Sequence, residues 1–293
     1  MNKKLSILSK VSRNDVILDP YPHIIIKNAL PQDIYETLYD ALPSPEIVLD
    51  GREKKDTWFD YPACKVTRDE RISSQWRSFF EYHTSEDFFK ELIEIFGESI
   101  KKTHPSIEKR LGKRLEDSIV KMRPGGRYDR LADGADISME CQFYVNYTRT
   151  SRSVRKSHVD RPSELFAALL YLRDDEDSST GGDLLIKEST NPSLLYPTPR
   201  SISIDELPME IDGTKVNTID RVKYESNTLV LFINSPQSIH EVSERSETEL
   251  PRRHINFCCD VPFDLFNIKH NWRNKLKLKA DTTPFIWRLK KYI

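Results

Sequence analysis

Two histidines and one aspartate, His158, Asp160 and His240, have the residue types and the spacing to hold a catalytic metal. His158 and Asp160 lie two residues apart in KSHVDRP, and His240 follows about eighty residues later in NSPQSIHEV. Side chains two residues apart in a strand project to the same face, so both can reach one ion. Two imidazoles and a carboxylate are the facial ligand set of non-haem Fe(II), which leaves coordination positions open for substrates. We therefore predict that these three side chains meet at one metal.

The His-x-Asp pair gains its specificity from the segments around it, because the pair alone arises by chance in many chains. The surrounding apolar runs are MECQFYVNY (139–147), LFAALLYL (165–172), GGDLLI (181–186), NTLVLFIN (227–234), SPQSIHEV (235–242) and PRRHINFCC (251–259). Most have strand length and are bounded by Pro, Gly, Asn, Asp or Ser, which is typical of buried strands in a β-sandwich. The spacing predicts an all-β core with the three candidate ligands at one open end.

Three segments before this core have the periodicity of helices. They are PQDIYETLYDAL (31–42), TSEDFFKELIEIFG (84–97) and SIEKRLGKRLED (106–117). The first begins with a proline, which suits the first helical position, and repeats apolar residues along one face. The second opens on a capping-box spacing and closes on Gly97. We expect these helices to support the strands of the core.

The core region, about residues 139–260, resembles the double-stranded β-helix (jelly-roll, cupin-like) core of the Fe(II)/2-oxoglutarate oxygenases, in particular the prolyl-4-hydroxylase-like branch. The shared features are, in order, His-x-Asp, a YL strand, Gly-Gly-acid, a hydrophobic strand, a distal His and an Arg. Residues 19–43 are similar to the short strand and first helix that precede this core, whereas 44–138 and 261–293 match weakly or not at all. The resemblance implies a mainly β fold with N-terminal helices packed on the larger sheet.

The pattern indicates one oxygenase domain over residues 1–293. In it, 1–138 form an N-terminal strand and helical support, 139–260 form the double-stranded β-helix core, and 261–293 form a C-terminal tail. Two irregular stretches, 121–136 and 188–220, are candidates to cover the substrate, because long irregular insertions in compact domains are often lids or binding loops. The alternative is that they are solvated excursions without contact to substrate.

Residue by residue, the resemblance implies that His158, Asp160 and His240 are the iron ligands at the catalytic centre. It implies a 2-oxoglutarate-dependent dioxygenase that uses Fe(II), O2 and the co-substrate 2-oxoglutarate to hydroxylate its substrate, with release of succinate and CO2. Relatives that halogenate have a small residue in place of the carboxylate ligand, so Asp160 favours hydroxylation. The substrate stays open between a small molecule, a sugar-like metabolite and a protein side chain, because loops vary over a shared fold.

An arginine on the strand after the distal histidine is expected, by the resemblance, to bind the far carboxylate of 2-oxoglutarate. Arginine suits this role because its planar guanidinium binds a carboxylate with two parallel hydrogen bonds and stays charged. Arg252 and Arg253 are the candidates, and Arg252 is favoured. Side-chain alternation would then turn His254 and Asn256 inward with Arg252. Arg253 is the alternative, because one sequence does not fix the register of a strand.

Two tyrosines are expected beside that arginine. Tyr171 occupies the position in the YL strand where prolyl hydroxylases bind the co-substrate carboxylate through a tyrosine hydroxyl. Tyr147 lies eleven residues before His158, where the family often has a tyrosine that faces the metal. A buried hydroxyl needs a hydrogen-bond partner, and a carboxylate would supply one. For both residues the alternative is an ordinary core aromatic.

The composition agrees with a soluble cytoplasmic enzyme. Charged residues make up 31% and hydrophobic residues 38% of the 293 residues, which is typical of a globular rather than a disordered chain. The net charge of -1 argues for neither nucleic acid nor a membrane surface as a partner. The first residues are not expected to act as an export signal, the sequence shows no long apolar run, and the four cysteines show neither a metal-ligand spacing nor a disulfide ladder.

Two other hypotheses stay open. The first is an iron enzyme that uses a reductant other than 2-oxoglutarate, in which case Arg252 and Arg253 would be structural. The second is a non-catalytic β-barrel that serves as a binding or scaffold protein, with a structural or vestigial metal site. The intact ligand set, the candidate carboxylate-binding arginine and Tyr171 together argue against the second hypothesis.

Overall fold

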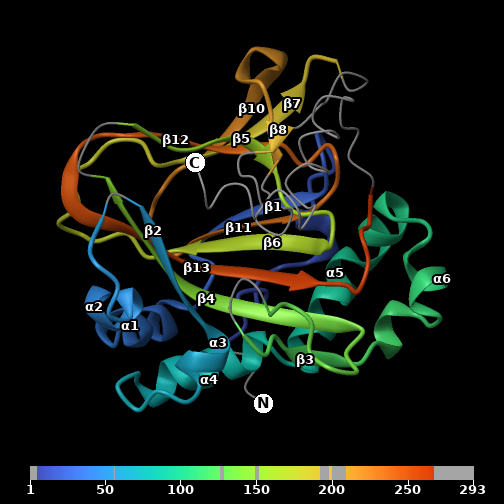
Figure 1. The fold of residues 1–293 in the computed structure, drawn as a ribbon, viewed down its shortest axis with the longest axis horizontal. Helices are drawn as coiled ribbons and strands as arrows, with labels where there is room; N and C mark the ends of the chain where they lie inside the picture. The colour runs from blue at the N-terminus through green and yellow to red at the C-terminus, as the bar shows by residue number, and fades with distance from the viewer. Residues whose placement is uncertain are drawn as a thin grey trace, which may run out of the picture.

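Strands mostly from the second half of the chain form two sheets that face each other, and helices from the first half lie below them (Figure 1). The computed structural model describes residues 5–55, 57–125, 129–148, 152–191, 198–199 and 209–266. The predicted C-terminal tail beyond residue 266 and parts of the predicted loops 121–136 and 188–220 lie outside these ranges. The roles of both loops as lids therefore stay predictions.

The larger sheet separates the helices from the smaller sheet. Its strand order is β1 (His23–Lys27), β11 (Thr228–Ile233), β6 (Glu164–Tyr171), β13 (Thr248–Asp260), β4 (Ile137–Thr148) and β2 (Trp58–Pro62), with β3 (Val120–Met122) beside β4. Neighbours in this order pair antiparallel, and β3 runs parallel to β4. The strands predicted from the apolar runs 139–147, 165–172, 227–234 and 251–259 are β4, β6, β11 and β13.

Alternation along the strands gives this sheet one apolar face and one mixed face. Ile137, Phe143 and the other odd-numbered residues of β4 join the main hydrophobic core, as do Ile255 and Phe257 of β13. Since successive side chains point to opposite faces, the even-numbered residues of both strands face the smaller sheet. The first face packs on the helices, and the second can contribute to a site between the sheets.

The helices begin and end where caps and packing allow. They are α1 (Gln32–Asp40), α2 (Pro45–Leu49), α3 (Ala63–Val66), α4 (Ser74–His83), α5 (Glu86–Thr103) and α6 (Ile107–Leu111). The prediction of a helix over 31–42 is confirmed by α1. The predicted end at Gly97 is wrong, because the buried face of α5 continues through Gly97 to Ile100. The helix predicted over 106–117 ends early, because Gly112 adopts a left-handed conformation with φ 72°.

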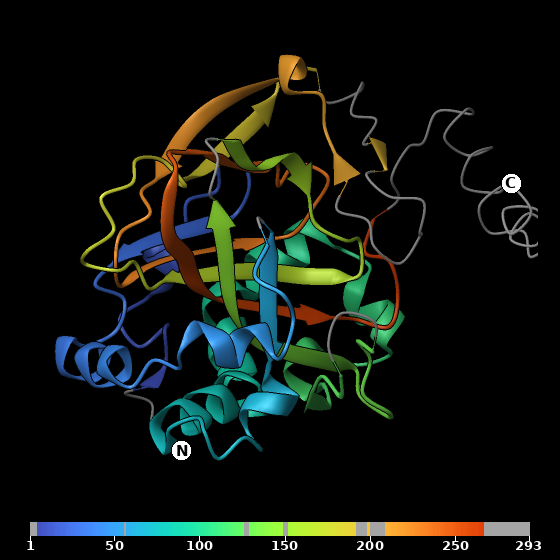
Figure 2. The same ribbon diagram turned by 60° about the vertical axis from the view of Figure 1, so that its left-hand side comes forward.

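The smaller sheet lies above the larger one in Figures 1 and 2. Its strand order is β10 (Val216–Val222), β7 (Leu184–Ser189), β12 (His240–Arg245), β5 (Arg152–Val159), β9 (Met209–Glu210) and β8 (Thr198–Pro199). Between the sheets, a second hydrophobic cluster includes Leu184 and Ile186 of β7, Val230 and Phe232 of β11, and Tyr171 of β6. The predicted fold class is confirmed: a mainly β, jelly-roll-like core with N-terminal helices on the larger sheet. None of the described helices has the length and apolar character needed to cross a membrane.

The Gly-Gly turn before β7 requires glycine at its first position. Gly181 has φ 78°, and a Cβ added to it would lie 1.8 Å from the carbonyl oxygen of Glu244. We expect Gly181→Ala to lower the free energy of unfolding by about 3 kcal/mol or more, because it combines backbone strain with a clash against main chain. Urea denaturation would measure this. Gly51→Ala is the matched control: Gly51 has φ 75° but open space around it, so about 1 kcal/mol is expected.

Candidate active site

The three candidate metal ligands come together on two neighbouring strands of the smaller sheet. β5 and β12 pair antiparallel, and His158 near the end of β5 lies opposite His240 at the start of β12. Asp160 follows directly after β5, which ends at Val159. Strand pairing therefore brings residue 240 beside residue 158, although the two are far apart in the sequence.

The geometry of the three side chains suits one ion. One ligand atom from each of His158, Asp160 and His240 lies within 4.8 Å of the others. The Nε2 atom of His158 lies 3.7 Å from Asp160 Oδ1, and the Nε2 atom of His240 lies 3.6 Å from Asp160 Oδ2. Both histidines are buried, whereas the Asp160 side chain is 13% exposed. Two nitrogen donors and one carboxylate form a set that fits a divalent transition metal such as Fe(II).

The main chain fixes the orientation of both imidazoles. His158 Nδ1 lies 2.7 Å from the carbonyl oxygen of Lys156, and His240 Nδ1 lies 3.0 Å from that of Ser238. A carbonyl oxygen only accepts hydrogen bonds, so each Nδ1 carries the proton and donates it. The lone pair then belongs to Nε2, the atom directed at Asp160. Such support of the second ring nitrogen is the usual way in which proteins orient a metal-binding histidine.

The surroundings of Asp160 hold the His240 imidazole and the Tyr21 hydroxyl in their neutral forms. Burial lowers the pKa of His240, although the charge of Asp160 opposes this effect. Burial and the charge of Asp160 both raise the pKa of Tyr21, whose hydroxyl donates a hydrogen bond to the carbonyl oxygen of Ile239 at 3.0 Å. Asp160 is thus flanked by a protonated phenol and a neutral imidazole, and Arg155 lies 3.9 Å from its Oδ1.

Arg252 is buried between the sheets without a carboxylate partner among the described residues. It is 1% exposed, and its Nε donates to the carbonyl oxygen of Gly182 at 2.8 Å. Its Nη1 lies 3.1 Å from His254 Nδ1. Burial and the charge of Arg252 hold the pKa of His254 well below its ordinary value, so this ring is neutral and accepts the hydrogen bond. Arg252 Nη2 is buried with no hydrogen-bond partner in the described ranges, which leaves one donor for an anion.

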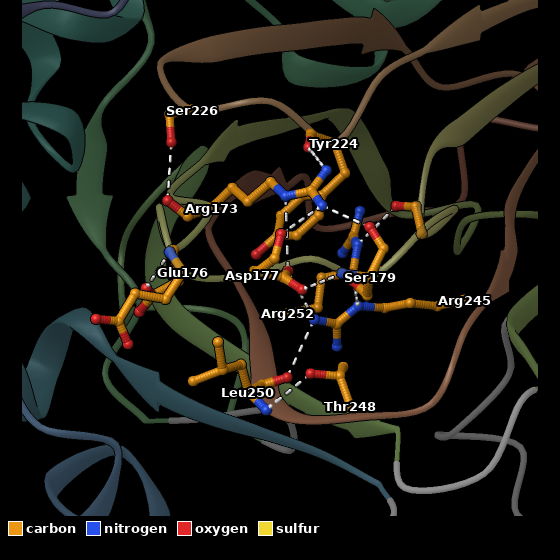
Figure 3. A network of polar contacts seen from close by, with 12 residues as sticks. Arg173, Glu176, Asp177, Ser179, Tyr224, Ser226, Arg245, Thr248, Leu250 and Arg252 are labelled. Carbon is orange, nitrogen blue, oxygen red and sulfur yellow. Dashed lines mark hydrogen bonds and ion pairs between the residues drawn. The ribbon is translucent and has the colours of Figure 1, made fainter.

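Tyr171 lies directly against this guanidinium. The centre of the Arg252 guanidinium is 4.9 Å from the Tyr171 ring and 5.0 Å from the ring of Tyr224 (Figure 3 labels Arg252 and Tyr224). The Tyr171 hydroxyl is buried and lacks a hydrogen-bond partner in the part of the chain that the structure describes. Burial raises the pKa of Tyr171 to about 12, so the hydroxyl stays protonated. Arg252 and Tyr171 thus offer two unsatisfied donors side by side, an arrangement that fits a carboxylate.

Arg252 and Arg253 lie on opposite faces of β13, and Arg252 is the one between the sheets. Arg253 points to the opposite face, where its guanidinium donates to Asp174 at 2.8 Å and to the Tyr39 hydroxyl at 3.3 Å. His254 lies inside with Arg252, and the Asn256 amide donates to Gln142 of β4 at 3.3 Å. The predicted inward row of β13 is therefore present.

The prediction that Tyr147 faces the metal is wrong. Tyr147 belongs to the odd-numbered row of β4, so its ring packs in the main core against Phe59 at 6.3 Å, with the Lys54 ammonium over it at 4.5 Å. The inward tyrosine of β4 is Tyr144, whose ring lies 4.6 Å from that of His254. Asn146 of β4, and not Tyr147, is the register partner of Arg252.

Two residues of this region were missed at the sequence level. Tyr224 precedes β11 in a segment without strand periodicity, and its ring contacts that of Tyr171 at 5.3 Å. Arg245, at the end of β12, lies in the hairpin EVSERSETELP, where a charged residue is normally predicted to be exposed to solvent. The single available signal was the GGD motif, since Gly182 supplies the carbonyl that orients Arg252.

Removal of the Tyr171 hydroxyl tests the carboxylate site with little risk to the fold. We expect Tyr171→Phe to weaken 2-oxoglutarate binding by about 10- to 100-fold, the value of one hydrogen bond to a charged group. Stability without ligand should stay equal or increase, because the deleted hydroxyl has no partner among the described residues. Calorimetric titration and thermal melting would measure the two effects. A large loss of stability with unchanged binding would instead identify Tyr171 as a core aromatic.

Comparisons with known proteins give structural similarities only. No family model and no curated protein matches the chain. It is similar to a prolyl 4-hydroxylase from Phytophthora capsici, with TM-score 0.48 and 14% identity over 98% of this chain and 78% of that chain. A Pseudomonas putida prolyl-4-hydroxylase gives TM-score 0.41 and 14% identity, covering 82% and 93%. A 2OG-Fe(II) oxygenase family oxidoreductase from Burkholderia pseudomallei gives 0.38 and 10%, covering 92% and 93%.

Proposed function

We propose that this protein is an Fe(II)- and 2-oxoglutarate-dependent dioxygenase that hydroxylates its substrate. One observation carries the proposal: the two-histidine, one-carboxylate cluster and a buried arginine without a carboxylate partner within the described ranges border the same apolar cluster between the sheets. His240 contacts Phe232 of that cluster at 4.6 Å, and Arg252 lies 4.9 Å from the ring of Tyr171 in it. A metal site alone would fit many proteins. A metal site and a buried arginine that border one apolar cluster fit a ligand that chelates the metal at one end and carries a carboxylate at the other.

Each group has a defined task in this proposal. His158, Asp160 and His240 would hold the iron on one side and leave its other side open. Arg252 and Tyr171 would bind the far carboxylate of 2-oxoglutarate and thereby fix its orientation. Bound in this way, iron, 2-oxoglutarate and O2 supply the oxidising power for hydroxylation, with release of succinate and CO2. The apolar cluster between the sheets would limit the access of water to the co-substrate.

A polar substrate suits the inner wall of the larger sheet, which continues past Arg252 as Asn256 and Asp260 on β13 and as Gln142 and Glu140 on β4. Glu140 is fully buried, and burial raises its pKa to about 7, although the charge of Arg123 opposes this effect. Arg123 donates to Asp260 and lies 3.7 Å from Glu140 Oε2. We therefore favour a small polar molecule or a polar protein side chain over an apolar substrate.

Anaerobic titration would test the function directly. Addition of 2-oxoglutarate to the Fe(II)-loaded protein should give a weak visible charge-transfer band, because the keto acid chelates the metal. Succinate release from 2-oxoglutarate, screened against pooled metabolites and peptides, would then identify the substrate. Binding of Fe(II) without any band or any effect of 2-oxoglutarate would favour the scaffold alternative or a different reductant.

A further inference from the structure

Arg245, the last residue of β12, is fully buried and held by an extended network of hydrogen bonds. Its Nε donates to the Ser179 hydroxyl at 3.0 Å, and its Nη2 donates to Asp177 Oδ2 at 2.8 Å and to the carbonyl oxygen of Leu250 at 3.0 Å (Figure 3). Its Nη1 is buried and has no hydrogen-bond partner in the described residues. One donor of this guanidinium is therefore left for a ligand.

The side chains of Arg245, Arg252 and Tyr171 lie around one aromatic ring. The ring of Tyr224 lies 5.0 Å from the guanidinium centre of Arg252, 5.9 Å from that of Arg245 and 5.3 Å from the Tyr171 ring. Both arginine stems also pass Gly182, where an added Cβ would lie 3.2 Å from Arg245 Cδ and 3.4 Å from Arg252 Cδ. The two arginines are thus neighbours in the same small region.

The charges of this region do not balance. Asp177 serves two cations, Arg245 at 2.8 Å and Arg173 at 3.6 Å, and Arg252 has no carboxylate partner within the described ranges. The nearby carboxylate of Asp183 is paired with Arg221 at 3.1 Å. An excess of buried positive charge is costly unless an anion neutralises it. The turn that carries Asp177 and Ser179 therefore holds Arg245 in place but leaves its Nη1 without a hydrogen-bond partner in the described residues.

We propose that Arg245 is a second carboxylate-binding arginine, which completes the site for the far carboxylate of 2-oxoglutarate together with Arg252 and Tyr171. The inference rests on the proposed function and adds a residue to it. A carboxylate has two oxygens with about four acceptor positions, enough for one donor from each of the three side chains. Asp177 and Ser179 are positioning residues, since they fix the guanidinium of Arg245 through its Nη2 and Nε.

The test compares two double variants that each remove one arginine of a strand and one aspartate of the turn after β6. Arg245→Met with Asp177→Asn deletes the buried pair but keeps an acceptor for the Ser179 amide, which lies 3.0 Å from Asp177 Oδ1. Arg253→Met with Asp174→Asn is the matched control on the opposite face of β13. Removing both partners of a buried pair is often neutral for stability, so both variants should fold. Each is loaded with redox-inert Mn(II), and 2-oxoglutarate is titrated calorimetrically.

We expect the Arg245 variant to bind 2-oxoglutarate about 10- to 100-fold more weakly than the wild type, with unchanged Mn(II) affinity by electron paramagnetic resonance. The control variant should match the wild type. Equal 2-oxoglutarate affinity in all three proteins would overturn the role of Arg245 alone. Failure of the wild type to bind 2-oxoglutarate would overturn the proposed function itself, which separates the two conclusions.

If the double variant does not fold, which loss of Mn(II) binding would indicate, a single variant tests the proposal instead. Arg245→Lys keeps the positive charge but lacks the planar fork that reaches Ser179, Asp177 and a ligand together. Weaker 2-oxoglutarate binding with normal Mn(II) affinity would support the proposal. Binding equal to that of the wild type would contradict it.

Discussion

Replacement of His158 by alanine should abolish both Fe(II) binding and turnover. The imidazole supplies one of three ligand atoms within 4.8 Å of one another, and no other His, Cys, Asp or Glu of the described chain joins this cluster. Loss of the metal removes several kcal/mol of transition-state stabilisation, so the rate of turnover should fall by about 10³-fold or more. Iron stoichiometry after anaerobic loading and succinate release would measure the two effects.

A second buried histidine provides the control. His83 lies in α4, fully buried among aromatic rings, and its Nε2 accepts a hydrogen bond from the Ile7 amide at 3.1 Å. His83→Ala should lower the melting temperature, because it leaves a cavity and an unsatisfied amide, but it should keep one Fe(II) per chain. Iron binding by His158→Ala at the wild-type level would remove the basis of the proposed metal site.

The second large effect is expected for Arg252→Gln. Loss of the buried guanidinium should weaken 2-oxoglutarate binding by about 10²-fold or more, because it truncates a desolvated charge that pairs with the carboxylate. The stability of the fold without ligand should change little, because relief from an unpaired buried charge offsets the lost hydrogen bonds to Gly182 and His254. Calorimetric titration of the Mn(II)-loaded protein, with thermal melting in parallel, would show both changes.

Arg253→Gln separates a carboxylate site from general damage to β13. Arg253 bonds Asp174 and Tyr39 on the helix side of the sheet, so its loss should reduce stability slightly and leave 2-oxoglutarate affinity unchanged. If Arg253→Gln, and not Arg252→Gln, weakened binding, the side-chain assignment along β13 would be off by one residue.

The local pattern was sufficient to predict the main strands of the core and which three side chains come together in the candidate metal site. His158 and Asp160 have the two-residue spacing of one strand face, and His240 lies in one of the runs of strand length, so pairing of neighbouring strands in a β-sandwich can bring them together. Alternation also predicted that His254 lies on the same face as Arg252. These features depend on one strand at a time, which is why they can be read from a single sequence.

The features that were missed depend on register and long-range packing. Tyr147 was misplaced because its face is set by how β4 pairs with β13, and one residue of shift exchanges the two faces. Gly97 was taken as a helix end, although tertiary packing of Ile100 extends α5 past it. The Arg245–Asp177 pair joins residues 68 positions apart through a turn without regular periodicity, so no local pattern could indicate it.

The use of main-chain carbonyls to orient both imidazoles has an evolutionary consequence. Every residue type carries a carbonyl, so the acceptor for His158 persists whatever side chain occupies the exposed position 156. A mutational scan should find that position permissive, in contrast to metalloproteins whose histidines are oriented by a neighbouring carboxylate. The surface beside the candidate metal site is thus free to change in evolution while the orientation of the His158 imidazole is retained.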